Sequence, residues 1–398
     1  IRAMARAGLD PAIGLEMIPL DRAGTLARFN RAKLTVDELP EALRARGLSL
    51  LGRSGAALAA VGRARVAGEL EARTAREYLA RHTARARTQA HGAARYRQLG
   101  RLAAVGAVAE AEGAAEDLIL GASAFVDRYD DAPGRAVGLE RSGAAGLLLG
   151  VERWWRTGFV ALRAGVHGQT ASALPVVELL AEDRLLPGWR LGLGLATGSV
   201  VPETPLQETL AARDTVSARL SGQLDDRLGT SLFASLEHHV DRGRRTLGFG
   251  ATLEGAVSWS AFRTRFGDEG ALYGSARTVL RQVEDELPAE LRALTEAGSS
   301  PSDLVPTDVS AVGVGFRLAR GSLDTVPDPR VALRYHLDVW LGGQWPLGQV
   351  AYQMGAGLGL RLMGPDELYV RGNLGNLVGG LDAVQADLQL GYRIRFDP

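Results

Sequence analysis

The sequence has no cysteine, only one lysine (Lys33) and few aromatic residues, 6% of 398. The lack of cysteine excludes disulfides, thiolate metal sites and cysteine nucleophiles, and it suits a chain that crosses an oxidising compartment. The 46 basic residues are balanced by 46 acidic residues. A nucleic-acid-binding protein would carry an excess of positive charge, so the composition argues against that class.

Long apolar runs are also missing. A transmembrane helix needs about 18–20 consecutive apolar residues, and the most apolar stretch, 143–151, is too short. The chain starts with neither a methionine nor a signal peptide, so we expect Ile1 to be an internal residue of a longer precursor. Glycine, by contrast, is abundant, with 50 residues spread over both halves of the chain.

Residues 1–80 have a helical pattern. Leu58, Val61, Val66 and Leu70 recur at roughly helical spacing among alanine, arginine and glutamate. This pattern predicts a helical segment over 1–80, although no 34-residue repeat is evident.

From about residue 81 the apolar residues recur with period two, which is typical of β-strands. The clearest case is 383–396, where Val384, Ala386, Leu388 and Leu390 alternate with polar residues. At about 10 residues a strand plus turns, 81–398 has room for about 16 strands. The pattern itself suggests somewhat more: 83–97, 101–112, 115–128, 134–141, 144–154, 157–168, 174–183, 188–198, 206–213, 215–223, 229–239, 246–255, 257–266, 308–319, 330–341, 347–362, 366–375 and 383–396.

Two architectures fit this alternation, a soluble β-sandwich used for adhesion or structure and an outer-membrane β-barrel. Strand length favours the barrel, because 347–362 and 383–396 exceed the usual ~5–6 residues. The tryptophans also favour it, since most of them lie at the ends of alternating runs, where a barrel carries its interfacial aromatic girdle. We therefore predict a mainly β fold, a transmembrane antiparallel barrel over 81–398 preceded by a short helical segment.

One segment does not alternate. Over 276–297, apolar residues recur at helical spacing with acids between them. We expect a long helical, acidic loop at about 268–306, because loops of this length are commonly lids, plugs or binding loops. Its acids are candidate gating residues: Glu284, Asp285, Glu286 and Glu290.

Catalytic motifs are weak. The six histidines show no metal-binding spacing, and glycine pairs lie inside strands rather than at strand-to-helix turns, so we predict no metal and no cofactor. Ser231, Ser235, Glu237 and His239 share the polar face of one strand. They leave open a barrel-embedded lipid hydrolase or acyltransferase, although we predict that the protein is not an enzyme.

The remaining chemistry lies in the barrel lining. The alternating residues predicted to point into the lumen include acids and a larger number of arginines. These charges either pair with each other and brace the wall, or they guide a polar polymer. The candidate polymer-guiding acids are Asp117, Asp127, Glu237, Glu254, Asp338 and Asp387, with Glu152 also on this phase.

Three stretches carry a family resemblance: Pro187 to Gly194, Leu206 to Leu220, and Ala386 to Phe396. With the helical segment before them, they resemble the C-terminal part of the PelB family, the outer-membrane export porins of the Pel exopolysaccharide system. The likeness covers about residues 60–398. It lies in the pattern of alternating residues and in the order of the segments.

The resemblance implies a barrel of about 16 strands that exports a polysaccharide to the cell surface. It implies periplasmic helices of the tetratricopeptide (TPR) type that contact a PelA-like modification enzyme, and a ring of small PelC-like lipoproteins beneath the barrel. The implied polymer is a partly de-acetylated, cationic amino-sugar chain, for which an acidic passage is expected. The arginine excess in the lining departs from that expectation, and the acids at 284–296 are the best candidates for a negative constriction.

Overall fold

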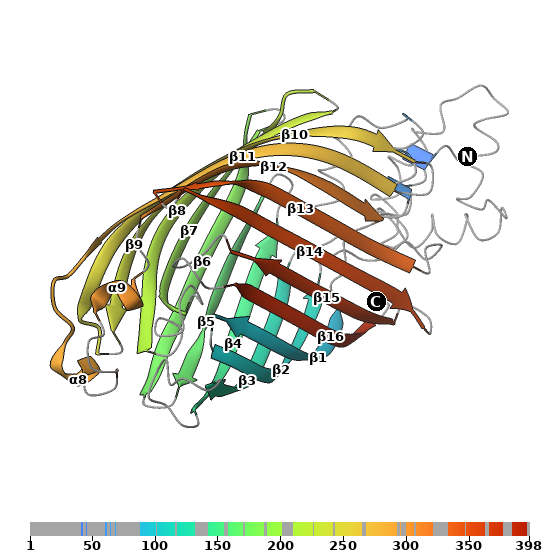
Figure 1. Cartoon of the computed structure of the whole chain (residues 1–398). Coiled ribbons are helices and arrows are strands. Elements are labelled where there is room, and N and C mark those ends of the chain that lie inside the picture. Colours follow the sequence, from blue (N-terminus) through green and yellow to red (C-terminus); the bar gives the residue numbers. More distant parts are fainter. Residues whose placement is uncertain are drawn as a thin grey trace, which may run out of the picture.

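In the computed structural model, the chain forms a closed antiparallel barrel of sixteen strands (Figure 1). From residue 88 to 395 the structure describes all but short segments, and before residue 88 it describes only isolated positions. The expected helical segment 1–80 therefore lies outside the described residues. The undescribed segments are 101, 116–117, 132–141, 155–157, 170–171, 187–188, 201–209, 226, 242, 265–267, 293–294, 296–299, 306–307, 321–332, 347, 363–365 and 377–383.

Each strand pairs with its sequence neighbours, and β1 pairs with β16 to close the barrel. Closure leaves no free sheet edge. In hydrocarbon a free edge would leave backbone N–H and C=O groups without hydrogen-bond partners. The strands are β1 Gln89–Leu99, β2 Leu102–Ala115, β3 Leu118–Asp131, β4 Ser142–Trp154, β5 Phe159–Gln169, β6 Ser172–Leu186, β7 Trp189–Ser199, β8 Ala211–Gln223, β9 Leu228–Asp241, β10 Thr246–Arg263, β11 Asp268–Val283, β12 Val309–Arg320, β13 Leu333–Trp345, β14 Gln349–Arg361, β15 Glu367–Gly375 and β16 Gln385–Arg395.

The two faces of the sheet differ in chemistry. Large apolar side chains cover the outer face, and many are highly exposed, for example Leu236 at 67% and Val314 at 69%. A sandwich would bury these side chains, so the soluble-sandwich alternative is wrong. Trp259 and Trp345 also face outwards, whereas Trp340 faces the lumen and donates its Nε1–H to Ser275 Oγ at 2.9 Å, so it is not part of a girdle.

The two ends of the barrel also differ. Because the strands are antiparallel and even in number, β1 begins and β16 ends at the same end. At the opposite end lie most of the long connections, β3–β4, β7–β8, β11–β12 and β15–β16, while the end that holds both barrel termini has short turns except at β12–β13. We call these the far end and the terminal end.

The β11–β12 connection forms a small folded insert at the far end. It contains the short helices α8 (Ala289–Arg292) and α9 (Pro301–Leu304), visible at the rim of the barrel in Figure 1. No helix among the described residues is long and apolar enough to cross a bilayer. The insert buries Leu287, Leu291, Leu304 and Val305 against wall residues that include Ala211, Leu247 and Val283. Since Ala211 and Val283 lie on the inward phase of their strands, the insert packs towards the lumen.

Two expectations about the strands need correction. Residues 246–255 and 257–266 form one strand, β10, with a register shift between Ser260 and Phe262. Residues 268–283 are not loop but strand β11, so the non-strand insert is limited to 284–308. The alternation breaks at Val279 and Val283 because these inward residues are apolar: Val283 packs against the apolar cluster of the insert, and Val279 is buried. The expected strands 134–141 and 206–213 lie mostly outside the described residues, although β8 begins within the second.

Candidate functional site: the lumen wall

The lumen wall contains a recurring unit of glycine, aromatic ring, arginine and carboxylate. Phe125 lies directly opposite Gly146 on the next strand, and a Cβ placed on this glycine would lie under 3.0 Å from the ring. The Arg95 guanidinium covers the ring at 5.0 Å from its centroid. Arg95 and Arg97 then both pair with the buried carboxylate of Asp127. Without a side chain at Gly146, the ring can lie close against the wall.

The same unit recurs on two other parts of the wall. Tyr273 lies over Gly315, beneath Arg317, and both side chains bind Asp338, at 2.5 Å for the tyrosine hydroxyl and 2.8 Å for the Arg317 Nε.

Tyr369 lies over Gly391, beneath Arg393, and Arg393 pairs with Glu367. Arg334 also binds the same Glu367 carboxylate, and all three charged side chains of this cluster are almost fully buried. Asp127, Asp338 and Glu367 are thus paired with arginines of other strands, either the next strand or the one beyond it, and these ion pairs connect the strands of the wall.

Glu237, near the far end, is another inward carboxylate that contacts two arginines. Its carboxylate accepts hydrogen bonds from Arg213 at 3.1 Å and from Thr252 at 2.9 Å, and Arg281 lies 3.5 Å away. Ser235 Oγ donates to Oε1 at 3.3 Å, while His239 Nε2 lies 3.3 Å from Oε2.

This geometry also bears on the hydrolase alternative. A serine nucleophile needs an imidazole against its hydroxyl, but here the Glu237 carboxylate lies between Ser235 and His239 and is held by two arginines. Ser231 lies further along the strand, on the lumen cavity. The four residues share one face, as predicted, but they do not form a nucleophile–base pair.

A cavity of about 860 Å³ occupies one side of the lumen, mostly towards the terminal end. Side chains of β8 to β15 line it, and small and hydroxyl-bearing residues predominate. The charged residues among them are Arg227, Glu254, Glu269, Arg277, Arg317 and Asp338.

Glu254 and Asp387 differ from the bracing acids. Both are inward-facing by register, and neither makes a hydrogen bond or ion pair with another described residue. Glu254 lines the cavity, while Asp387 lies beside Asn373, which also lines it. Asp117 lies outside the described residues. Of the predicted guiding acids, Glu254 and Asp387 therefore lack a hydrogen bond or close ion pair with a described residue, although Asp387 lies near enough to Arg371, Arg97 and Arg95 to interact with them electrostatically.

The arginine excess in the lining is smaller than the sequence suggested. Inward-facing residues of both signs were not recognised in the sequence, because strand phase is hard to fix where alternation is weak. The register adds six acids, Glu110, Glu112, Glu178, Glu182, Glu269 and Glu367. It also adds five arginines, Arg95, Arg97, Arg213, Arg277 and Arg281, so the two signs are nearly equal in number.

Comparison with known proteins shows the family of this chain. A family model described as "PelB, C-terminal beta barrel domain" matches residues 85–395. This chain belongs to the PelB C-terminal β-barrel family. A search of curated proteins found no match.

Among solved structures, the chain is similar to a "Bacterial polysaccharide outer membrane secretin", with a TM-score of 0.53 and 11% identity over 78% of this chain and 99% of that one. It also resembles OccK1 of Pseudomonas aeruginosa (TM-score 0.38, 13% identity, 77% and 98% coverage). A third is Wzi, a carbohydrate-binding barrel involved in Escherichia coli capsule assembly (TM-score 0.38, 11% identity, 82% and 88% coverage). The first likeness supports the barrel fold of this PelB-family protein. The protein is an outer-membrane β-barrel of a polysaccharide-export family, a class that is usually non-enzymatic.

The insert of this PelB-family barrel places the four predicted gating residues at its surface. Glu284, Asp285, Glu286 and Glu290 are exposed, and the Glu284 N–H donates to the Leu247 carbonyl at 3.0 Å. Glu286 pairs with Arg292 inside the insert. The Glu290 carboxylate pairs with Arg245 of the β9–β10 turn at 2.7 Å, and this hydrogen bond raises the pKa of the arginine.

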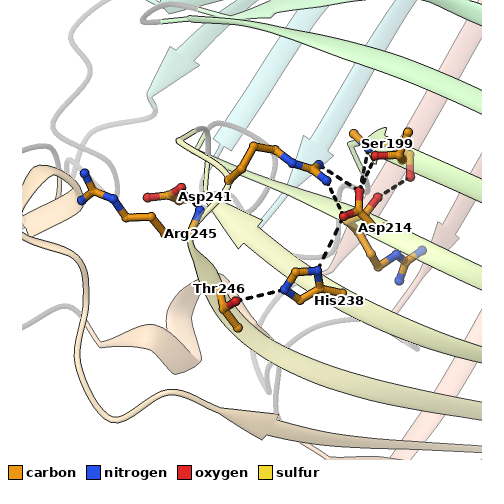
Figure 2. A network of polar contacts seen from close by, with 10 residues as sticks. Ser199, Asp214, His238, Asp241, Arg245 and Thr246 are labelled. Atoms are coloured by element: carbon orange, nitrogen blue, oxygen red, sulfur yellow. Dashed lines mark hydrogen bonds and ion pairs between the residues drawn. The ribbon is translucent and has the colours of Figure 1, made fainter.

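A second polar cluster lies on the outer face at the far end of the PelB-family barrel (Figure 2). Asp214 accepts hydrogen bonds from the Gly198 N–H at 2.9 Å, from Thr197 and from both terminal nitrogens of Arg244. His238 lies between Asp214 and Thr246, 3.6 Å and 3.1 Å away, and its ring stacks on Phe249. His238 thus faces outwards and His239 inwards, as the alternation predicted.

This cluster fixes a bulge and a turn rather than forming part of the lumen. Asp214 joins β7, where the register shifts between Ala196 and Ser199, to the β9–β10 turn. Within that turn, the Arg245 N–H donates to Asp241 Oδ1 at 2.8 Å. Figure 2 shows Asp214 and His238 on one side of the turn and Asp241 with Arg245 on the other.

Proposed function

We propose that this barrel is a passive conduit that carries a Pel-type, cationic amino-sugar polymer across the outer membrane, and that it performs no covalent chemistry. The observation that carries the proposal is a closed barrel with an apolar outside and a charged lumen, in which Glu254 and Asp387 make no hydrogen bond or close ion pair with a described residue. A hydrated polymer loses its water contacts in hydrocarbon, whereas lumen side chains replace those contacts.

The direct test is single-channel recording of the purified protein in a planar bilayer. We expect discrete ion-conducting steps, which become larger or more frequent when residues 284–308 are replaced by a short turn. A correctly folded barrel that conducts no ions in either form would overturn the proposal.

The insert is proposed as a gate at the far end. Supporting this role, four of its apolar side chains pack towards the lumen and Glu290 is tied to the barrel wall by Arg245. Its deletion should raise leakage of antibiotics into cells that express the protein. Glutamine or asparagine at Glu284, Asp285 and Glu286 should slow export of a cationic polymer without changing barrel stability. Unchanged leakage after deletion would remove the gating role.

The orientation and partners are part of the same proposal. Outer-membrane barrels have short periplasmic turns and longer outer loops, which assigns the terminal end to the periplasm and the insert to the cell surface. Residues 1–80 would then form a TPR-type helical segment in the periplasm, available to a PelA-like modification enzyme and a PelC-like lipoprotein ring. Cross-linking of the membrane-embedded protein should capture both partners through residues 1–80 or the terminal-end turns, and capture only at the far end would reverse the orientation.

A further inference from the structure

A groove of about 530 Å³ lies on the outer face of the barrel, across strands β5 to β10 and towards the far end. Large apolar side chains that point outwards line most of it, among them Leu179, Leu195, Leu236 and Phe249. Its volume is within the range of sites that bind small molecules. Because the outer face of a membrane barrel meets hydrocarbon, the part of a ligand that fits this apolar lining is an acyl chain.

The groove changes from apolar to polar at one height on the barrel. On the outer face of β8 and β9, Val216 lies directly opposite Leu236. Two residues further towards the far end, Asp214 lies directly opposite His238, and all four residues line the groove. Thr246 contacts His238 from the start of β10 (Figure 2). A lipid has the same order, with apolar chains towards the middle of the membrane and a polar head group at its surface. A lipid that lies along the groove therefore places its head group beside the polar residues.

Arg244 in the β9–β10 turn provides a positive charge at this polar end. Its φ is 66°, a left-handed conformation that is strained for a residue other than glycine. Its Nη1 and Nη2 donate to the two carboxylate oxygens of Asp214 at 2.9 and 2.7 Å. A guanidinium has five N–H donors, so three are left, and no other group in the described part of the chain accepts from them. The side chain is 46% exposed, so these donors are open to a ligand.

Asp214 positions this arginine without using up its capacity for an anion. The Asp214 carboxylate also accepts hydrogen bonds from the Thr197 hydroxyl at 2.8 Å and from the Gly198 N–H at 2.9 Å. These two donors stabilise part of the negative charge of Asp214, so Arg244 is not its sole partner. The neighbouring Arg245 points to the other side of the turn and pairs with Glu290 of the insert.

We propose that the groove binds a membrane lipid whose head group carries a phosphate, with an acyl chain along the apolar lining and the phosphate on Arg244. A guanidinium binds phosphate oxygens through two parallel N–H groups, which a neutral or cationic head group cannot accept as well. The site is on the lipid side of the wall, so the inference does not depend on what passes through the lumen. With the insert at the cell surface, as proposed above, the bound lipid belongs to the outer leaflet.

The test is native mass spectrometry of the full chain in detergent, which resolves each bound lipid. Three probes separate the two parts of the ligand: phosphatidic acid, diacylglycerol with the same acyl chains, and inorganic phosphate. We expect phosphatidic acid to bind about tenfold more tightly than diacylglycerol, since hydrogen bonds to charged groups are the stronger kind. Inorganic phosphate at the same concentration should not displace it, because it lacks the acyl chains.

Two outcomes would overturn the inference. Equal binding of the two lipids would show that the head group is not recognised. Displacement of phosphatidic acid by an equal concentration of inorganic phosphate would show a site for free anions instead of a lipid site.

A variant at the polar end tests the head-group contact. Arg244→Gln should weaken the binding of phosphatidic acid about tenfold and leave that of diacylglycerol unchanged. Arg227→Gln is the matched control, because it removes the charge of an exposed arginine in the β8–β9 turn at the terminal end. It should change neither affinity. Heat-modifiable gel mobility confirms that each variant is folded, and equal losses in the two variants would reduce the effect to general electrostatics and contradict the assignment.

A second variant tests the apolar end and leaves the turn intact. Leu236→Ala removes apolar surface from the groove and should weaken both lipids several-fold. Leu388→Ala, at an outward leucine on β16 that is not part of the groove, should weaken neither. Unchanged binding of both lipids to Leu236→Ala would exclude the groove as the acyl-chain site.

Failure of this inference differs from failure of the conduit. If the protein conducts ions in a bilayer but does not prefer phosphatidic acid, the lipid site is wrong and the conduit stands. If it prefers phosphatidic acid but does not conduct, the conduit is wrong and the lipid site stands.

Discussion

The lumen of this barrel contains two kinds of carboxylate. Asp127, Glu237 and Glu367 are buried, each contacts at least two arginines, and each joins side chains of different strands. Glu254 and Asp387 share the same wall and the same inward phase but contact no described side chain at bonding distance. We infer from this difference that the paired acids mainly connect strands, whereas the acids without a close ion pair are the better candidates for contact with the polymer.

The largest effect should come from breaking a fully buried cluster. Glu367→Gln leaves Arg334 and Arg393 buried without their shared carboxylate, and we expect a loss of about 3–5 kcal/mol in the free energy of unfolding. Urea unfolding in detergent, followed by tryptophan fluorescence, measures it. Glu254→Gln is the matched control, since that carboxylate has no partner to lose. A similar loss in both variants would remove the distinction between the two kinds of acid.

A smaller effect should follow from filling the space beneath an aromatic ring. In Gly146→Ala the new Cβ meets the Phe125 ring at under 3.0 Å, so the ring and Arg95 must move. We expect a loss of about 1–3 kcal/mol, as for other overpacked sites. Gly113→Ala is the control, because its Cβ would meet nothing within 4 Å. Both are read by the same unfolding assay, and a larger loss at position 113 would contradict this account.

The acids without a close ion pair should affect transport. Glu254→Gln should shift the free energy of unfolding by less than about 0.5 kcal/mol, while secretion of polymer falls. Asp387→Asn should also lower secretion, with some loss of stability because its carboxylate interacts with Arg371, Arg97 and Arg95. Secreted polymer in cells expressing equal amounts of folded barrel is the measurement. Normal secretion by the double variant would place both acids among residues without a role in transport.

The smallest effect is expected at the surface of the insert. The Glu290–Arg245 pair is exposed on both sides, so Glu290→Gln should cost at most about 1 kcal/mol. It should, however, increase the frequency of channel opening if the insert is a gate, which single-channel recording detects. An unchanged opening frequency would show that this ion pair does not hold the insert in place.

The barrel could be predicted from the sequence because apolar and polar residues alternate with period two. This alternation indicates that the two faces of each strand meet different surroundings, one apolar and one polar. The prediction failed at β11, where two inward residues are apolar: Val283 packs against the apolar cluster of the insert, and Val279 is buried. The identity of the bracing acids could not be predicted either. Whether Asp338 is paired depends on Arg317 lying directly opposite on the next strand, and this register is not visible in a single sequence. Glu367 was missed for the same reason, since its partners Arg334 and Arg393 are distant in the chain.

The glycines beneath the aromatic rings have a consequence for the width of the passage. Phe125, Tyr273 and Tyr369 lie in recesses where the opposite residue has only a hydrogen atom. The bore at these heights therefore depends on a ring recessed over a glycine and covered by an arginine, whose guanidinium carbon lies 5.0 to 5.6 Å from the ring centroid. A lysine in place of such an arginine would stand up from the ring and narrow the bore, even though the charge would be unchanged.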